Sequence, residues 1–189
     1  DRRAGRIATE KCTELCAKLS KIKVTGAETF VQPVKEHRFV LVFRGKKLAA
    51  DINDTDPQKL GAEPLPAVAS KAVAKATASI VNEFLDSARK TLADEHPANM
   101  VLLRGFSKYP PDVPPMPEVF KLKPAAIAIY PMYRGLAKVV GMEILQAGST
   151  IKDEFAAAAK NYDKYDFFFI HIKGTDSAGE DGDFARKVS

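Results

Sequence analysis

The sequence predicts an α/β protein with two parts, an α+β unit over residues 1–97 and an α/β unit over residues 98–189. In the second part, apolar runs that read as strands alternate with helical segments, which is typical of a parallel sheet with crossover helices. In the first part, a helix, two strands and a long helix follow one another. The composition, with 46% hydrophobic and 28% charged residues, is that of a globular chain with a packed core.

The first part begins with apolar residues at helical spacing over residues 6–21, which predict an amphipathic helix. Residues 24–34 and 38–44 read as strands, and the second is a continuous apolar run that we expect to be buried on both faces. Residues 51–66 form a loop. Residues 67–95 are rich in alanine and lack glycine and proline, so they predict a long helix that ends before Pro97. Its apolar stripe consists of Val68, Ala72, Ile80, Phe84, Ala88 and Leu92.

The second part contains three runs that predict strands, at residues 99–103, 125–129 and 165–172. Helices are predicted at 133–140 and 151–161, between the later strands. The last strand carries His171, which we expect to be a hydrogen-bonded core histidine and not a ligand. A loop over residues 173–183 follows, and another helix begins at Phe184.

Two cysteines, Cys12 and Cys16, lie four residues apart on the first predicted helix, and therefore on one face of it. Buried thiols are the expected explanation, with a redox or metal-binding pair as the alternative. Free thiols fit a reducing, cytoplasmic setting. The sequence contains no run of apolar residues long enough for a membrane span, and we expect no secretory signal in its opening residues.

The net charge of +5 raises the question of nucleic-acid binding. The lysines and arginines are spread along the chain, however, and no zinc-knuckle, helix-turn-helix or RNP-type pattern accompanies them. A diffuse positive charge suits a small anionic substrate equally well. We therefore expect neither a nucleic-acid nor a membrane partner.

The loop at 173–183 gathers acidic and hydroxyl groups around glycines, beyond the carboxyl end of a predicted strand. Ligands of open parallel sheets bind at such edges, and carboxylates suit Mg²⁺ and Mn²⁺. An acidic loop that caps the next helix would look the same. Composition alone leaves both explanations open.

Four segments of the second part resemble the metalloenzyme core of cofactor-independent phosphoglycerate mutases of the archaeal type, members of the alkaline phosphatase superfamily. They are NMVLLRG (99–105), KPAAIA (123–128), YPMYRGLA (130–137) and HIKGTDSAGEDGD (171–183). In that family the last loop reads D-x-x-G-H-x-G, and its Asp and His bind one of two catalytic metals. The resemblance implies that Asp176 is a metal ligand and that Glu180, which replaces the His, is a second one. It also implies a cofactor of Mn²⁺ or Mg²⁺, with no requirement for bisphosphoglycerate.

The first part resembles the insert domain of the same family, which holds the carboxylate and phosphate of the substrate with arginines. The segments DRRAGRI (1–7), EHR (36–38) and FRG (43–45) carry this resemblance, with DTDP (54–57) nearby. Arginine suits the task because its planar fork binds both groups by paired hydrogen bonds. A solvated arginine at the end of a strand is the alternative at each position. The implied substrate-binding residues are Asp1, Arg2, Arg38, Arg44 and, after a core strand, Arg134. Arg104 also follows a predicted core strand and could line the same cleft.

The resemblance implies a metal-dependent isomerase of glycolysis or gluconeogenesis that interconverts 3-phosphoglycerate and 2-phosphoglycerate through a phosphoenzyme. The nucleophilic Ser or Thr is expected before Asp1 and the second metal set after Ser189, so the 189 residues alone should not turn over. Three alternatives stay open: another phosphomutase or a phosphodiesterase of the superfamily, a non-catalytic phosphate-binding module, and a nucleic-acid-binding domain.

Overall fold

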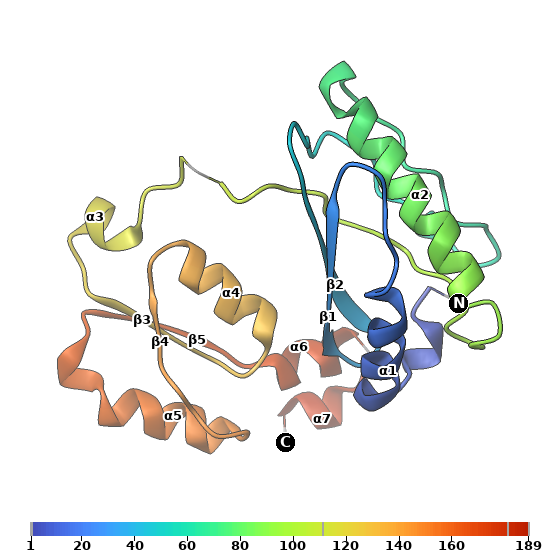
Figure 1. The fold of residues 1–189 in the computed structure, drawn as a ribbon. Coiled ribbons are helices and arrows are strands. Elements are labelled where there is room, and N and C mark those ends of the chain that lie inside the picture. The colour runs from blue at the N-terminus through green and yellow to red at the C-terminus, as the bar shows by residue number, and fades with distance from the viewer. Residues whose placement is uncertain (1, 111, 181, 189) are drawn as a thin grey trace. The chain divides into compact units, whose positions relative to one another are not determined.

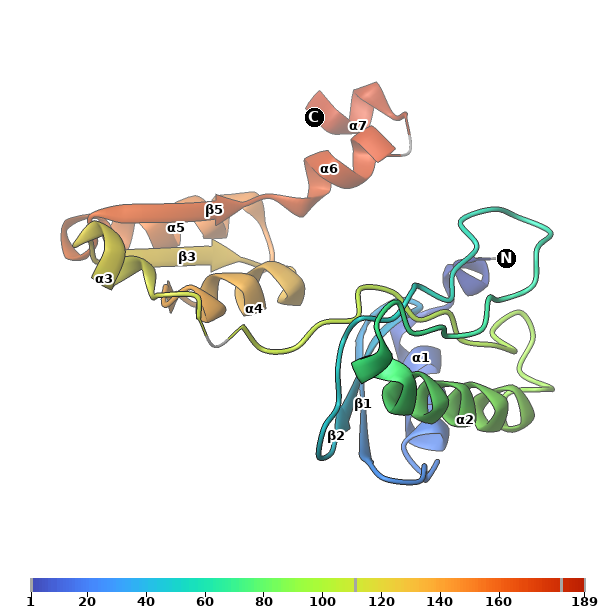
Figure 2. The same ribbon diagram turned by 90° about the horizontal axis from the view of Figure 1, so that it is seen from above.

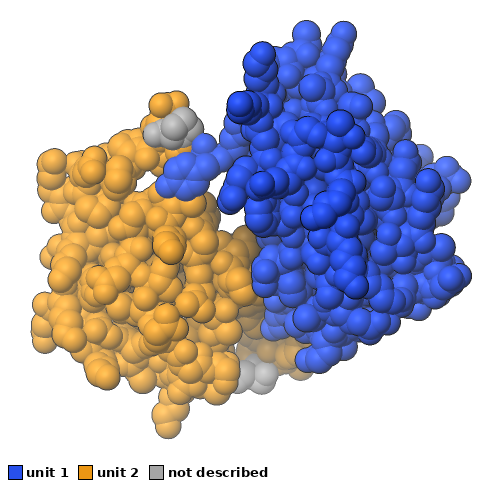
Figure 3. Space-filling view, viewed as in Figure 1, with its two compact units in different colours: residues 1–109 blue, residues 110–189 orange. Residues whose placement is uncertain are grey.

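The computed structural model describes residues 2–110, 112–180 and 182–188. The chain divides into two compact units, residues 1–109 and residues 110–189, which are coloured separately in Figure 3. The boundary predicted between residues 97 and 98 lies within the first unit. The segment that follows Pro97 belongs there because Ala98, Val101 and Leu103 are buried in the core of that unit.

The first unit packs two helices against a β-hairpin (Figures 1 and 2). A short 3-10 turn, Ala4–Arg6, precedes α1 (Thr9–Leu19), which is shorter than the predicted 6–21. The strands are β1 (Glu28–Lys35) and β2 (Arg38–Arg44). A second 3-10 turn, Ala72–Ala74, leads into α2 (Lys75–Thr91).

The prediction that β2 is buried on both faces is wrong. The strand pairs only with β1, antiparallel, among the described residues, and its side chains alternate between half-buried and exposed. Phe39, Leu41 and Phe43 pack against the core, whereas Val40 and Val42 face outward and are nearly half exposed. An antiparallel hairpin that packs on one side has this alternation, although the run of residues on it is continuously apolar.

The long helix is confirmed over its central part only. It starts at Lys75, and Val68 and Ala72 of the predicted stripe are exposed. Residues 67–71 do not extend the helix because Ala69 forms a β-bridge with Ile52 instead. The rest of the stripe is buried, and the ring of Phe84 meets that of Phe43 edge to face, with centroids 5.8 Å apart. This contact joins α2 to the hairpin.

Cys12 and Cys16 are buried on the inner face of α1 as free thiols, with their sulfur atoms 4.0 Å apart. Burial raises the pKa of the Cys16 thiol to about 12. Both cysteines therefore act as small apolar core residues, as expected.

The second unit is built on a parallel sheet in the order β4-β3-β5, which confirms the predicted α/β class. The central strand β3 (Pro124–Ala128) is buried along its whole length, and β5 (Phe167–His171) pairs with it. The two-residue strand β4 (Glu143–Ile144) was not predicted. The segment 99–103, predicted as a strand, lies outside the strands of the described residues and belongs to the first unit.

Helices cover this sheet on both faces: α4 (Pro131–Val139) packs on one and α5 (Ile151–Lys160) on the other (Figure 1). Helix α4 begins at a proline, which suits the first helical position because its missing N–H would have no partner there. Helix α5 begins with a capping box between Thr150 and Asp153. The remaining elements are α3 (Met116–Phe120), the 3-10 turn Tyr162–Lys164, α6 (Lys173–Glu180) and α7 (Phe184–Val188).

Candidate functional site

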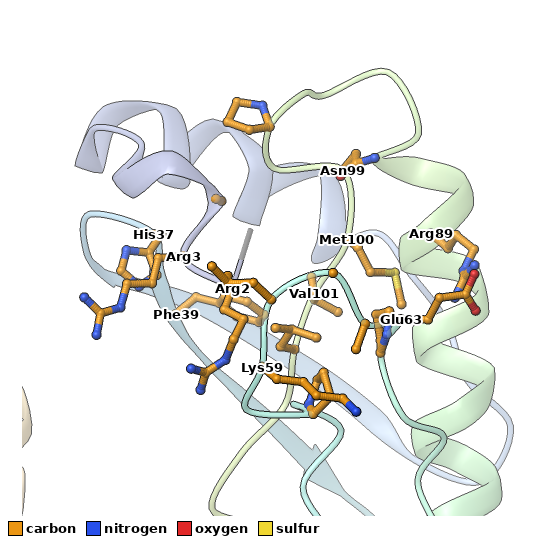
Figure 4. A pocket seen from close by; sticks show the side chains of 18 residues that line it. Arg2, Arg3, His37, Phe39, Lys59, Glu63, Arg89, Asn99, Met100 and Val101 are labelled. Carbon is orange, nitrogen blue, oxygen red and sulfur yellow. The ribbon is translucent and has the colours of Figure 1, made fainter.

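A cavity of about 490 Å³ opens in the first unit, and positively charged side chains surround it (Figure 4). It is formed by the start of the chain, the beginning of β2, the loop at 57–64, the last turns of α2 and the segment 97–102. Phe39, Met100 and Val101 supply apolar surface. The charged and titratable side chains that line it are Arg2, Arg3, His37, Lys59, Glu63 and Arg89. With one carboxylate among four cations, the cavity is suited to an anion.

Arg2 is held at this cavity by a buried carboxylate. Its Nε donates to Oδ1 of Asp56 at 2.8 Å and its Nη2 donates to Oδ2 at 2.7 Å, a bidentate pair. The Asp56 side chain is 4% exposed, whereas that of Arg2 is 30% exposed. These bonds from Arg2 lower the pKa of Asp56 to about 2, so the carboxylate is ionised at every physiological pH.

The loop that carries Asp56 is fastened to the end of the first unit. Thr55 is fully buried; its backbone N–H donates to the carbonyl of Leu103 at 2.8 Å, and the Leu103 N–H donates to the Thr55 hydroxyl at 2.8 Å. Beside them, the Gly105 N–H donates to Oδ1 of Asp54 at 2.9 Å. These bonds place Arg104 next to the loop, where its Nη1 lies 3.5 Å from Oδ2 of Asp56 and its Nε 3.7 Å from Oδ2 of Asp54.

His37, at the turn between β1 and β2, lines the same cavity. Burial lowers its pKa, and the nearby charge of Arg38 lowers it further. The ring is therefore neutral at pH 7, and its buried Nδ1 has no hydrogen-bond partner among the described residues. The cationic character of the cavity thus comes from arginine and lysine.

The predicted substrate-binding residues are only partly brought together. Arg2 lines the cavity, whereas Asp1 lies outside the described residues. Arg38 and Arg44 stand at opposite ends of β2, six residues and hence about 20 Å apart. Arg38 pairs with Glu36 at 3.4 Å near His37, and Arg44 lies over the ring of Phe30, 4.5 Å from its centroid. The structure therefore does not group Arg38 and Arg44 at one point of the strand.

The other candidates lie in the second unit. Arg134 is half-buried in the first turns of α4, beyond the carboxyl end of β3. Residues 173–180, predicted as a loop, form helix α6, which places Asp176 and Glu180 one turn apart on the same face. The Lys173 ammonium binds the Asp176 carboxylate and lowers its pKa.

His171 ends β5 and differs from the hydrogen-bonded core residue that the strand pattern predicts. It is half-buried and stacks on Tyr133 with ring centroids 3.4 Å apart. Its buried Nδ1 has no hydrogen-bond partner in the described part of the chain, and burial lowers its pKa. The stacked ring of Tyr133 is therefore the main contact that the structure shows for this side chain.

A complete metal site is absent from the described ranges 2–110, 112–180 and 182–188, because no group of three or more His, Cys, Asp or Glu residues lies close enough to hold an ion. In the same ranges, no helix is both long and apolar enough to cross a membrane. Asp176 and Glu180 could therefore supply part of a ligand set but not all of it.

Sequence reasoning placed the tract containing Asp56 near the arginine-bearing segments but gave Asp56 no role in the site. The tract Asp54-Thr55-Asp56-Pro57 marks a loop, but nothing in its composition indicates that Asp56 is buried against Arg2, which is 54 residues away. It also missed Lys59 and Arg89, whose sequence neighbours suggest only a solvated loop and a helix surface. The pairing of Thr55 with Leu103 is a tertiary contact that no local pattern predicts.

The fold and the cavity define an α/β protein whose first unit contains an arginine-rich cavity with a charge that suits a small anion. The sequence profile of the 2,3-bisphosphoglycerate-independent phosphoglycerate mutases matches residues 1–99, more than half of the chain. The chain belongs to this family, as the resemblance predicted.

Relatives and solved structures agree with this assignment. The chain is 49% identical to a probable 2,3-bisphosphoglycerate-independent phosphoglycerate mutase of Thermotoga maritima, covering 100% of this chain and 47% of the relative. For the Aquifex aeolicus relative, similarly described, the identity is 47%, with 100% of this chain and 48% of the relative covered. The chain thus spans about half the length of the curated relatives it matches.

The structure of the cofactor-independent phosphoglycerate mutase from Thermoplasma acidophilum superposes with a TM-score of 0.64 at 28% identity, covering 91% of this chain and 49% of that one. The PH0037 protein from Pyrococcus horikoshii has a TM-score of 0.71 at 22% identity, covering 97% of this chain and 46% of that one, and supports the fold alone.

Proposed function

We propose that this chain provides the phosphoglycerate-binding part of a mutase that interconverts 3-phosphoglycerate and 2-phosphoglycerate in glycolysis or gluconeogenesis. The observation that carries the proposal is the arginine-rich cavity, with Arg2 locked on buried Asp56, within the segment that matches the family profile. A glycolytic role would place the protein in the cytoplasm.

The geometry suits the retention of a glycerate during transfer of its phosphoryl group. Guanidinium groups bind carboxylate and phosphate through paired hydrogen bonds and keep their charge at all physiological pH values. Neutralisation of the equatorial phosphate oxygens by such groups favours phosphoryl transfer. We propose no nucleophile within this chain, and we expect the 189 residues by themselves to be inactive as a mutase.

Binding of 3-phosphoglycerate to the chain, followed by isothermal titration calorimetry without metal, tests the proposal. We expect a micromolar to millimolar dissociation constant, and much weaker binding of glycerate, which lacks the phosphate. Arg38→Glu should weaken binding about tenfold or more, because it places negative charge beside His37 at the cavity. Lys46→Glu is the matched control, because Lys46 is exposed just after the same strand and does not line the cavity, and it should have little effect.

Two results would contradict this function. A calorimetric titration with 3-phosphoglycerate that shows no binding heat would refute the proposed binding role. Binding of duplex DNA with a steep salt dependence, but no binding of phosphoglycerate, would favour the nucleic-acid alternative.

We further propose that Asp176 and Glu180 contribute oxygen ligands to a Mn²⁺ or Mg²⁺ site. Their spacing on α6 supports this, since carboxylates four residues apart lie on one helix face. Because they form only part of a ligand set in the described residues, no reaction step is assigned to the metal.

Addition of MnCl₂ should selectively broaden the backbone amide NMR signals of α6. Asp176→Asn should abolish this effect, whereas Asp163→Asn, a change at an exposed carboxylate of the same unit, should preserve it. Broadening that is uniform over the chain, or unchanged in Asp176→Asn, would refute the assignment.

A further inference from the structure

Asp56 contacts two arginines that come from opposite ends of the first unit. Oδ2 lies 2.7 Å from Nη2 of Arg2 and 3.5 Å from Nη1 of Arg104. Both guanidinium groups therefore lie close together around one buried oxygen. The two guanidinium groups carry like charges and repel each other. The Asp56 carboxylate offsets this repulsion because it contacts both groups.

The fold does not need Asp56 to bring these segments together. Hydrogen bonds of Thr55 with Leu103 and of Asp54 with Gly105 already fasten the loop to the chain before and after Arg104. The Asp56 carboxylate adds a contact to the Gln58 N–H at 2.8 Å and otherwise acts on the two guanidinium groups. Its main effect is therefore on where the arginines point.

Both arginines keep donors for a ligand. The bond to Asp56 uses the Nε–Nη2 edge of Arg2, and a guanidinium has five N–H groups. The Arg104 side chain is 55% exposed, and its contacts at 3.5 and 3.7 Å are loose. Asp54 partly offsets its charge, but Arg3 and Lys59 line the same cavity as Arg2, so the surroundings remain positive.

We propose that Asp56 is a positioning residue that fixes Arg2 and Arg104 as a guanidinium pair, and that this pair receives one acid group of the phosphoglycerate. The inference rests on the proposed function; what it adds is the pairing of Arg104 with Arg2 through Asp56. Holding the pair in place before the ligand arrives removes the cost of ordering two long side chains on binding. Asp56 itself does not touch the substrate.

The test compares 3-phosphoglycerate binding by calorimetry in the 189-residue chain and in Asp56→Asn, Arg104→Ala and the double variant. Asp56→Asn and Arg104→Ala should each weaken binding about tenfold or more. Both changes disrupt the same guanidinium pair. The loss of 3-phosphoglycerate affinity in the double variant should therefore be much smaller than the product of the two single losses. Asp51→Asn is the matched control: Asp51 pairs with Lys71 at 2.6 Å in the same loop region but does not line the cavity, so binding should not change.

A second readout reports positioning directly. In ¹⁵N NMR spectra the Nε–H signal of Arg2 should be protected from exchange in the parent chain and in Asp51→Asn, and should exchange rapidly in Asp56→Asn. A residue that only stabilised the fold would instead lower the unfolding temperature without coupling to Arg104.

The outcomes separate the two proposals. If the parent chain does not bind 3-phosphoglycerate, both the proposed function and the guanidinium-pair proposal are refuted. If the parent chain binds and Asp56→Asn binds equally well, only the positioning role is overturned. If Asp56→Asn does not fold, Arg104→Ala decides, because it changes an exposed side chain; unaltered affinity in that variant would refute the guanidinium pair.

Discussion

Replacement of Phe84 by alanine should lower the free energy of unfolding of the first unit by about 3–5 kcal/mol, the usual cost of truncating a buried phenylalanine. The Phe84 side chain is completely buried on α2 and meets Phe43 of β2 edge to face. Its loss would leave a cavity between the helix and the hairpin. Arg89 on α2 and Phe39 on β2 both line the cavity. The substitution would therefore loosen the packing that holds these two side chains in place.

Urea denaturation monitored through the NMR signals of α2 measures this effect. These signals report the free energy of unfolding of the first unit without a contribution from the second. Val73→Ala is the control in the same unit, because Val73 is 63% exposed and should cost less than about 0.5 kcal/mol. A loss of less than about 1 kcal/mol in Phe84→Ala would show that the helix and the hairpin are not joined through this ring.

Replacement of Glu154 by glutamine should stabilise the second unit at pH 8 by about 1–3 kcal/mol, because glutamine does not carry the negative charge that is costly to bury there. Glu154 is 1% exposed on α5, and its Oε1 has no hydrogen-bond partner among the described residues. Burial raises its pKa, and a hydrogen bond from the Ile129 backbone offsets only part of this effect. Ionisation therefore costs more in the folded unit than in the unfolded chain.

The pH dependence has a definite sign. A carboxyl group whose pKa is raised on folding favours the folded unit below its unfolded pKa of about 4.3, and this stabilisation is lost as the pH rises through the folded pKa. The advantage of Glu154→Gln should therefore vanish at pH 4 and grow toward pH 8 in thermal unfolding of the second unit. Glu118→Gln, at an exposed position, should show no such trend. An advantage that does not vary with pH would contradict the explanation.

The sequence predicts elements well where one periodicity dominates. The apolar runs of β3 and β5 and the spacing in α1 and α2 suffice for the fold class. Prediction fails where tertiary contacts decide. The run 38–44 is apolar enough for a buried strand, yet with β1 as its partner it forms a hairpin that packs on one face. Residues 99–103 look like a strand, but Leu103 bonds to Thr55 outside any sheet.

The candidate site follows the same division. Residue type and family resemblance indicate that arginines are involved, and Arg2 does line the cavity. They cannot indicate which arginines share one ligand, because this depends on distance: β2 separates Arg38 from Arg44 along its length. Nor can they reveal Asp56, since the burial of one carboxylate depends on packing between segments far apart in the sequence.

The junction of residues 2, 56 and 104 also links ligand affinity to conformational stability. It draws on the beginning, the middle and the end of the first unit, so an unfolded chain cannot reproduce it. A ligand that binds there binds only the folded unit, and by mass action it must raise the free energy of unfolding, by about 2.7 kcal/mol at a concentration one hundred times its dissociation constant. If phosphoglycerate binds there as proposed, part of the thermodynamic stability of this unit would depend on the phosphoglycerate concentration.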